Sequence, residues 1–424
     1  MNARGTALSA LIACRKRGAW SDSVLKTYIA RDGLDQRDAA LASRLCYGVI
    51  QNRRLLDFYI AHFLTGSLQK LQPVVLDILR LGAYQIALAD RIPDSAAVNE
   101  AVEQAKKYAN PRAAGLVNGV LRAMSRAEAL PQPGDLATRF SHSPALVELF
   151  RLNVGDELLE PLLKSHNETP PTTLQVNTLK TSAEIIAAET GGTAHPWLPD
   201  CVTVAGVGDV AALPCFTRGE VYAQDAASRL AVLAADPGPG MRVLDCCAAP
   251  GGKSFACAIA MENRGEILSC DLHENKLRHI EQGAARLGLS IIRTAACDAR
   301  EFAPERENAF DLVLCDAPCS GLGVIRKKPD IREKDLGAIA ALPQVQLDIL
   351  RTVGKYVKPG GVLLYSTCTI LKRENEEVVR AFLQDAPFAP EDFSFAALSS
   401  RDGMLTLLPC VHGTDGFFIA KLRK

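Results

Sequence analysis

The second half of the chain alternates short apolar segments with helical patterns, and this alternation limits the possible folds more than any other feature. The apolar segments are six or seven residues long and cover residues 241–246, 266–271, 290–296, 310–316 and 361–366. Strands that alternate with helices form open parallel sheets, because each helix returns the chain to start the next parallel strand. We therefore predict a Rossmann-like α/β domain over residues 236–424, ending in two further strands at 405–409 and 416–422.

The first part of the chain has a different pattern, in which apolar residues recur every three or four positions. Leu41, Leu45 and Val49 are one example, and alternation of β-branched residues is nearly absent. Residues 129–136, ALPQPGDL, contain proline and glycine and are typical of a linker. The sequence thus predicts an all-α domain over residues 1–130.

Residues 131–235 combine both kinds of pattern. A helix is predicted at 144–152, a strand at 172–179, a second helix at 182–189 and another strand near 202–207. We interpret this stretch as a small α+β connector. The whole chain is then a multidomain protein with α and α/β parts.

The composition and hydropathy of the sequence indicate the cellular compartment. No segment reaches the roughly 18 uninterrupted apolar residues of a membrane span, and the first twenty residues lack the pattern of a secretory signal. We therefore expect a cytoplasmic protein with no membrane contact. The 13 cysteines should stay reduced in that compartment, and none has zinc-ligand spacing, so no metal site is expected.

Charge is distributed unevenly, although the net charge is zero. Residues 1–130 hold 18 Lys and Arg against 11 Asp and Glu, and the remainder holds 30 against 37. A basic helical module favours a polyanionic partner such as a nucleic acid. A solvated helix surface explains the excess equally well.

A glycine-containing turn follows the first predicted strand of the α/β domain. It consists of Cys247, Ala248, Ala249, Pro250, Gly251, Gly252 and Lys253. Glycines allow a ligand to approach the backbone, and the helix that follows offers free N–H groups. A phosphate loop would need glycine in place of Cys247, and the dinucleotide fingerprint G-x-G-x-x-G is absent. The turn therefore predicts a ligand without phosphates.

Three aspartates follow successive strands at the same edge of the predicted sheet. Asp271 ends the second strand, Asp298 follows the third and Asp316 ends the fourth. A carboxylate after the second strand can accept both hydroxyls of a ribose, and one after the third can accept from an adenine amino group. Each aspartate alone is more often a helix cap or a strand-end residue. Together with the uncharged turn they indicate S-adenosylmethionine as the cofactor.

Two cysteines, Cys319 in DAPCSG and Cys368 in STCT, follow strands at this same edge. Free cysteines are usually buried packing groups, but these two adjoin polar turn residues. Carbon 5 of cytosine is too weak a nucleophile to accept a methyl group until a thiolate adds to carbon 6. That reaction also needs an acid near ring nitrogen 3, to balance the developing charge. A cysteine and Asp316 on neighbouring strand ends meet both needs.

The motifs CAAPGGK, DAPCSG and STCT, supported by RENEE at 373–377 and DGFF at 415–418, resemble the RsmB/NOP/Sun family of RNA 5-methylcytosine methyltransferases. The resemblance covers nearly the whole chain. It implies a NusB-like RNA-binding domain over 1–130, a connector over 131–235 that binds RNA, and a class I S-adenosylmethionine-dependent methyltransferase domain over 236–424. The NusB-like module favours 16S ribosomal RNA as the substrate, free or in a partly assembled small subunit, and the family suggests a monomer.

The resemblance also implies roles for individual residues. Cys368 is the expected nucleophile, Cys319 assists in breaking the covalent adduct, and Asp316 is the acid that faces the base. The cofactor contacts are expected from Cys247 to Lys253 and from Asp271, Asp298 and Asp316. DNA 5-methylcytosine enzymes attack with the Pro-Cys cysteine instead, so the Thr-Cys motif indicates RNA chemistry.

A basic run follows the Cys319 loop, and Arg326, Lys327, Lys328 and Arg332 are predicted to contact RNA phosphates. A solvated loop is the alternative. The sequence departs from the family pattern at Gln175, where relatives often have arginine, which puts in doubt an RNA contact by the connector. It also has Ser254 and Gly283 where threonine and asparagine are common, and neither touches the proposed chemistry.

Two other functions remain open from the sequence. A transfer-RNA methyltransferase would share the catalytic motifs, although the NusB-like module argues against it. An RNA-binding assembly or antitermination factor with a vestigial catalytic domain is the non-enzymatic alternative. The presence of Asp316, Cys319 and Cys368 argues against a catalytic domain that has lost its activity.

Overall fold

A computed structural model describes residues 2–17, 20–90, 92–396 and 398–424. The chain divides into two compact units. Unit 1 consists of Met1–Asn167 and Lys328–Lys334, and unit 2 consists of Glu168–Lys327 and Asp335–Lys424. This division does not coincide with the predicted boundaries at residues 130 and 235. Helices beyond residue 130 join unit 1, and so does a short segment from the middle of the α/β sequence.

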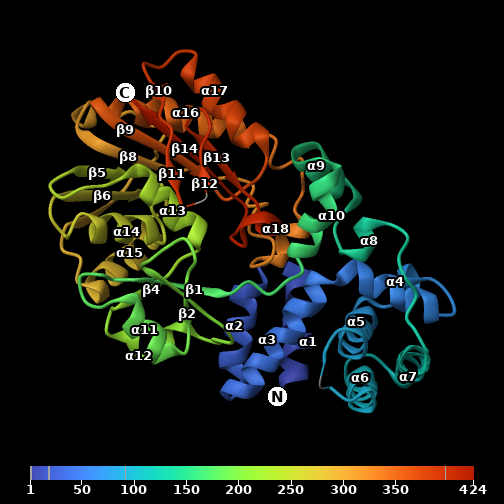
Figure 1. The fold of residues 1–424 in the computed structure, drawn as a ribbon. Helices are drawn as coiled ribbons and strands as arrows, with labels where there is room; N and C mark the ends of the chain where they lie inside the picture. The colour runs from blue at the N-terminus through green and yellow to red at the C-terminus, as the bar shows by residue number, and fades with distance from the viewer. Residues whose placement is uncertain (1, 18–19, 91, 397) are drawn as a thin grey trace. The chain divides into compact units, whose positions relative to one another are not determined.

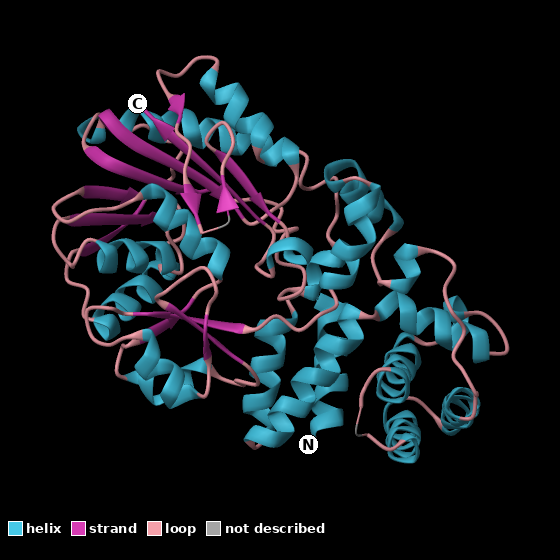
Figure 2. Ribbon diagram, in the orientation of Figure 1, coloured by secondary structure: helices cyan, strands magenta, loops and turns pink. Residues whose placement is uncertain are grey.

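Unit 1 is helical throughout its described residues (Figures 1 and 2). Its α-helices are α1 (Ala3–Arg17), α2 (Ser21–Asp32), α3 (Gln36–Gln51), α4 (Arg53–Phe63), α5 (Pro73–Ala87), α6 (Asp94–Tyr108), α7 (Pro111–Ser125), α8 (Leu136–Arg139), α9 (Pro144–Val154) and α10 (Asp156–Ser165). Two 3-10 turns, η1 (Leu68–Lys70) and η4 (Pro329–Glu333), complete the unit. The all-α prediction for the first part of the chain is confirmed.

Local signals in the sequence explain where these helices begin. The side chain of Asn110 accepts a hydrogen bond from the Ala113 N–H (2.9 Å), and Pro111 occupies the first turn of α7. Asp35 caps α3 in the same way. These caps satisfy N–H groups that have no partner inside the helix. The apolar stripes of the helices then meet in one core, which includes Leu45 and Leu79.

Arg332 of η4 is buried inside unit 1, with 2% of its surface exposed. Its guanidinium donates to the carbonyl oxygens of Phe140 (2.8 Å), Ser141 (3.3 Å) and His166 (2.7 Å) and to Oδ1 of Asn167 (2.6 Å). Burial lowers the pKa of Arg332 to about 9. Arg332 thereby attaches η4 to the helices of this unit.

Replacing Arg332 with methionine is expected to lower the free energy of unfolding by about 2–4 kcal/mol, because several buried acceptors lose their donor. Urea unfolding of the full-length chain, followed by circular dichroism, measures the change. Arg151→Met is the control, since Arg151 forms only exposed ion pairs and should change stability by less than about 0.5 kcal/mol. Equal stability of the two variants would contradict the anchoring role of Arg332.

The main sheet of unit 2 has the strand order β10-β14-β9-β8-β5-β6-β7, and β13 pairs with β14 (Figures 1 and 2). The edge strand β10 is only two residues long, Ala389–Pro390. Its long strands are β5 (Arg242–Asp245), β6 (Glu266–Asp271), β7 (Ile292–Ala296), β8 (Phe310–Asp316), β9 (Val357–Thr367), β13 (Met404–Leu407) and β14 (Phe417–Arg423). Strands β5 to β9 are parallel, whereas β13 and β14 are antiparallel. The predicted open sheet is present, but its C-terminal part is mixed.

Helices cover both faces of this sheet. On one face, Val243 and Leu314 join a core with α13 (Ala226–Ala235), α14 (Gly252–Ala260) and α15 (Glu274–Leu287). On the other face, Leu244 and Val313 pack with α16 (Leu342–Val353) and α17 (Glu376–Leu383). Successive residues of a strand point to opposite faces, so each apolar strand supplies both cores. This two-sided burial explains why the strands are continuous apolar runs.

A smaller antiparallel sheet precedes the main sheet in unit 2, with the order β2-β3-β1-β4. Its elements are β1 (Thr172–Val176), β2 (Thr193–Ala194), β3 (Cys201–Val204), β4 (Val221–Ala223), α11 (Ala183–Thr190), α12 (Pro214–Thr217) and η2 (Val210–Ala212). It has its own apolar cluster around Leu174 and Val202. The predicted α+β character of this stretch is confirmed. Among the described helices of the whole chain, none has the length and apolarity needed to cross a bilayer.

Candidate functional site

The glycine-containing turn connects the end of β5 to the start of α14. Gly251 has a φ of +110°, and a Cβ atom there would lie 2.5 Å from the ring of Phe255. A Cβ at Gly252 would approach the amide of Gln224 to 2.9 Å. Gly251 therefore needs glycine, whereas the flexible Gln224 side chain can move away from a Cβ at Gly252. The turn presents bare backbone at the N-terminus of α14. Such a turn fits a cofactor that contacts main-chain atoms.

Two of the predicted acids lie at the ends of neighbouring strands on the cofactor side. Asp271 ends β6 and is mostly buried; its Oδ1 accepts from the His273 N–H (3.0 Å) and lies 3.5 Å from Lys276 Nζ. Asp271 Oδ2 has no hydrogen-bond partner among the described residues, so it can accept from a ribose hydroxyl. Asp298 follows β7 and binds Arg300 through both carboxylate oxygens, which lowers the pKa of Asp298. The sequence did not indicate that partner.

The two predicted catalytic thiols lie together. Cys319 follows β8, Cys368 follows β9, and their Sγ atoms are 3.2 Å apart. Both side chains are partly exposed. A hydrogen bond to Cys368, followed by burial, raises the pKa of Cys319 well above its usual value. The raised pKa favours the protonated thiol of Cys319, and either sulfur can be the donor in this contact.

Asp316 links this thiol pair to the glycine-containing turn. Its Oδ2 lies 2.6 Å from Lys253 Nζ, and its Oδ1 accepts from Ser366 Oγ (2.7 Å). Lys253 also donates to Ser228 Oγ at 2.8 Å. Lys253 was predicted to contact the cofactor, and its ammonium group lies against the carboxylate of Asp316, the predicted acid. The turn, the acid and the thiols are thus connected at one edge of the sheet.

The supporting motif RENEE holds the thiol loops in place. Glu374 of RENEE is fully buried, and its Oε2 accepts from the Ser320 N–H (2.8 Å) and from Gln346 Nε2 (3.0 Å). Asn375 accepts from Thr367 Oγ1 at 2.6 Å. These contacts hold Ser320, which follows Cys319, and Thr367, which precedes Cys368. Sequence reasoning had assigned no role to Glu374 or Asn375, although their motif had been noticed.

The residues of the predicted RNA-binding run have different surroundings. Arg326 forms an ion pair with Asp415 of DGFF (2.9 Å), and Lys327 binds the carboxylates of Asp415 (2.7 Å) and Asp225 (2.5 Å). Arg332 is buried in unit 1, as described above. A phosphate contact by Arg326 or Arg332 would therefore require these protein contacts to break. Lys328 is exposed and forms no ion pair among the described residues.

Gln175 of the connector is also internal. It is 1% exposed, and its Nε2 donates to the carbonyl oxygen of Gln224 (3.1 Å) and to Cys201 Sγ (3.3 Å). This side chain holds β1 against its neighbours and leaves no surface for RNA. The doubt raised by the departure from arginine thus has a structural basis.

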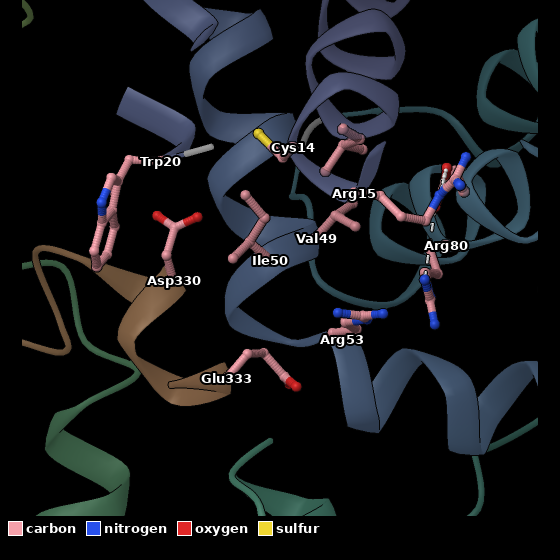
Figure 3. A pocket seen from close by; sticks show the side chains of 11 residues that line it. Cys14, Arg15, Trp20, Val49, Ile50, Arg53, Arg80, Asp330 and Glu333 are labelled. Atoms are coloured by element: carbon pink, nitrogen blue, oxygen red, sulfur yellow. Dashed lines mark hydrogen bonds and ion pairs between the residues drawn. The ribbon is translucent and has the colours of Figure 1, made fainter. Parts of the chain in front are cut away.

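Unit 1 contains a separate pocket of about 290 Å³. Figure 3 shows Trp20, Asp330 and Glu333 on one side of it and arginines on the other. Arg15 forms an ion pair with Asp77 at 2.9 Å, so part of the positive charge of these arginines is already balanced. The pocket contains none of the predicted catalytic or cofactor residues. No group of three or more potential metal ligands was found in the part of the chain that the structure describes.

The fold and the site define the class of protein. A doubly wound sheet with a glycine-containing turn after its first strand and acids after the next two is the arrangement of a class I methyltransferase. The bare turn and the free oxygen of Asp271 fit S-adenosylmethionine, which is the cofactor of this class. The chain is an S-adenosylmethionine-dependent methyltransferase with an N-terminal helical domain.

Comparison with known families agrees and is more specific. Residues 232–423 match the family model described as 16S rRNA methyltransferase RsmB/F, and residues 1–126 match the NusB family. A probable ribosomal RNA small subunit methyltransferase B from Bacillus subtilis is 41% identical, with 99% of this chain and 98% of that protein covered. The corresponding methyltransferase B from Klebsiella pneumoniae is 33% identical, with 100% and 98% covered. The chain therefore belongs to the RsmB/F family of 16S rRNA methyltransferases, with a NusB domain at its N-terminus.

Solved structures show the same fold. The crystal structure of PH0851 has a TM-score of 0.82 and 26% identity, and the match covers 100% of this chain and 99% of that one. A methyltransferase homolog protein from Pyrococcus horikoshii has a TM-score of 0.60 and 28% identity, covering 69% of this chain and 100% of its own. The predicted fold class and cofactor are confirmed.

Proposed function

We propose that this protein transfers a methyl group from S-adenosylmethionine to carbon 5 of a cytosine in 16S ribosomal RNA, through a covalent intermediate on Cys368. The observation that carries the proposal is the 3.2 Å approach of the Cys368 and Cys319 sulfurs beside Asp316. A single reactive thiol serves many chemistries. Two thiols and a carboxylate on adjacent strand ends suit one reaction in which a thiol adds to a ring and must leave again.

The first step is the addition of Cys368 to carbon 6 of the base. The new S–C bond pushes an electron pair toward carbon 5 and the ring nitrogens. A proton from the ammonium group of Lys253, 2.6 Å from Asp316, passes through that carboxylate to ring nitrogen 3 and neutralises the negative charge that develops on the ring; it returns by the same path when the product leaves. Carbon 5 is then nucleophilic enough to take a methyl group. When bound, S-adenosylmethionine supplies that group as an electrophile.

The second step releases the product. The proton on carbon 5 is removed by a base, the double bond re-forms, and the bond between carbon 6 and the Cys368 sulfur breaks. The protonated Cys319 donates a hydrogen bond to the departing sulfur, which stabilises it as a thiolate. The resting arrangement of the two thiols is thereby restored.

The residues from Cys247 to Lys253, with Asp271 and Asp298, are our proposed cofactor contacts. Asp271→Ala is expected to weaken S-adenosylhomocysteine binding about 10- to 100-fold, because a charged acceptor of ribose hydroxyls is lost. Isothermal titration calorimetry measures the affinity. Asp385→Ala, at an exposed carboxylate, is the control and should bind normally. Wild-type affinity in Asp271→Ala would remove Asp271 from the proposed site.

The RNA substrate is proposed from the family and from charge. The NusB domain carries the basic excess of the chain, and such domains bind RNA polyanions through Lys and Arg. Within the predicted basic run, Lys328 has the most accessible charge. The target cytosine must be unpaired or flipped, because a stacked base hides carbon 6 from attack. The assay below compares naked RNA with a partly assembled small subunit as the substrate.

The function is tested by mapping 5-methylcytosine in RNA from strains with and without this gene. The expected result is loss of one modified cytosine in 16S ribosomal RNA and no change in transfer RNA. Purified protein should then restore the mark in RNA, or in small-subunit particles, from the deletion strain. Loss of a transfer-RNA mark instead would favour the alternative substrate. Transfer to neither RNA would favour the non-enzymatic binding role.

A further inference from the structure

A second group of cysteines, apart from Cys319 and Cys368, lies at the carboxyl ends of four neighbouring strands. Cys315 precedes the last residue of β8, Cys246 follows β5, Cys270 precedes the last residue of β6 and Cys297 follows β7. The first three are buried, whereas Cys297 is partly exposed. Buried thiols are usually inert, and partly exposed thiols become reactive where neighbours stabilise the thiolate.

Cys297 has such neighbours. Arg306 Nη1 lies 3.5 Å from the Cys297 sulfur and 3.8 Å from that of Cys270. The carboxylate of Glu305 is 3.8 Å from Arg306 and largely exposed, so it competes weakly for the guanidinium. A hydrogen bond from Cys270, together with Arg306, lowers the pKa of Cys297. By contrast, burial raises the pKa of Cys14, which is also partly exposed, to about 11.

Cys297 also adjoins both acids of the cofactor site. Its N–H donates to the carbonyl oxygen of Asp271 at 3.1 Å, and Asp298 is the next residue. The Cys297 side chain packs against the core that contains Cys270. A group added to its sulfur has to displace that packing, and with it the backbone that carries both proposed adenosine contacts. This step of the inference rests on the proposed cofactor contacts, and it is independent of the RNA chemistry.

We propose that Cys297 is a modification site that reacts with peroxide and other soft electrophiles, and that its modification prevents the cofactor from binding. With hydrogen peroxide, the thiolate sulfur attacks one oxygen, an S–O bond forms, and the O–O bond breaks. Hydroxide leaves and is protonated to water by an acid of the buffer. The sulfur loses two electrons to the peroxide and becomes a sulfenic acid. An added dithiol reverses the change, releasing water and forming its own disulfide.

Reactivity is tested on the full-length protein with iodoacetamide at pH 7, followed by peptide mass spectrometry. Cys297 should be alkylated at least about tenfold faster than Cys14, because more of it is thiolate. Saturating S-adenosylhomocysteine should protect Cys297 and leave Cys14 unchanged. Arg306→Gln should slow the alkylation of Cys297. Equal rates at the two cysteines, or absence of protection, would overturn the proposal.

The effect on cofactor binding is tested with hydrogen peroxide. Oxidation should weaken S-adenosylhomocysteine binding by at least about tenfold in the wild type, because the added oxygen crowds the site. Dithiothreitol should restore binding, and Cys297→Ser should resist the oxidant. If Cys297→Ser is as sensitive as the wild type, the modification site lies elsewhere and the proposal fails. Methyl transfer to ribosomal RNA by unmodified protein tests the proposed function separately.

Discussion

Cys368→Ala is expected to lose methyl transfer by about 10⁴-fold or more, since without the thiolate carbon 5 of cytosine cannot be activated. Tritiated-methyl transfer to 16S ribosomal RNA under single-turnover conditions measures this loss. Cofactor binding should stay within about twofold of the wild type, because Cys368 follows β9 and the cofactor turn follows β5. The split between lost chemistry and retained binding distinguishes a nucleophile from a structural residue.

A matched control for this variant is Cys410→Ala, which removes another partly exposed thiol from unit 2. It should leave the transfer rate unchanged. Wild-type turnover by Cys368→Ala would exclude the covalent mechanism. Loss of both transfer and cofactor binding would point to misfolding, which thermal unfolding of the same preparation would reveal. Cys368→Ser provides a second variant of nearly the same size.

Cys319→Ala is expected to trap the enzyme on its substrate. Without the hydrogen bond from Cys319, the Cys368 sulfur is a poorer leaving group, so the adduct with carbon 6 should accumulate. Denaturing gel electrophoresis should show an RNA–protein complex, and transfer should stop near one methyl group per enzyme. In the wild type the complex should be at least about tenfold less abundant, the factor given by one lost hydrogen bond to a charged group.

The double variant Cys319→Ala, Cys368→Ala is the decisive control for this trap. It should form no complex, because the attacking sulfur is absent. A complex in the double variant would mean that another residue forms the bond. Product release at the normal rate by Cys319→Ala alone would show that Cys368 leaves without assistance.

Much of the fold was accessible from the sequence because its signals are local. The bounds predicted for β6 and β8 coincide with those observed, since buried parallel strands are unbroken apolar runs. The C-terminal strands were also predicted, but their antiparallel direction was not. Strand direction depends on how the chain returns to the sheet, and no residue type encodes it.

The site was predicted as a set of residues and not as a set of contacts. Each motif marks a strand end, and parallel strands bring those ends to one edge. The bond between Lys253 and Asp316 joins residues 63 positions apart, so no spacing could indicate it. Arg332 was predicted to contact RNA, and its internal hydrogen bonds were missed for a related reason. An arginine in a charged loop has the same sequence signature whether water or buried carbonyl oxygens surround it.

The path of the chain around η4 restricts how this protein can be divided. Seven residues, Lys328–Lys334, belong to unit 1 although sequence from unit 2 flanks them on both sides. A shortened protein starting at residue 168 would expose Ile331 and Arg332, which the intact molecule buries, and would leave that guanidinium without its acceptors. No single cut therefore frees an intact methyltransferase half. We therefore expect relatives that have this seven-residue segment in unit 1 to keep both units on one polypeptide.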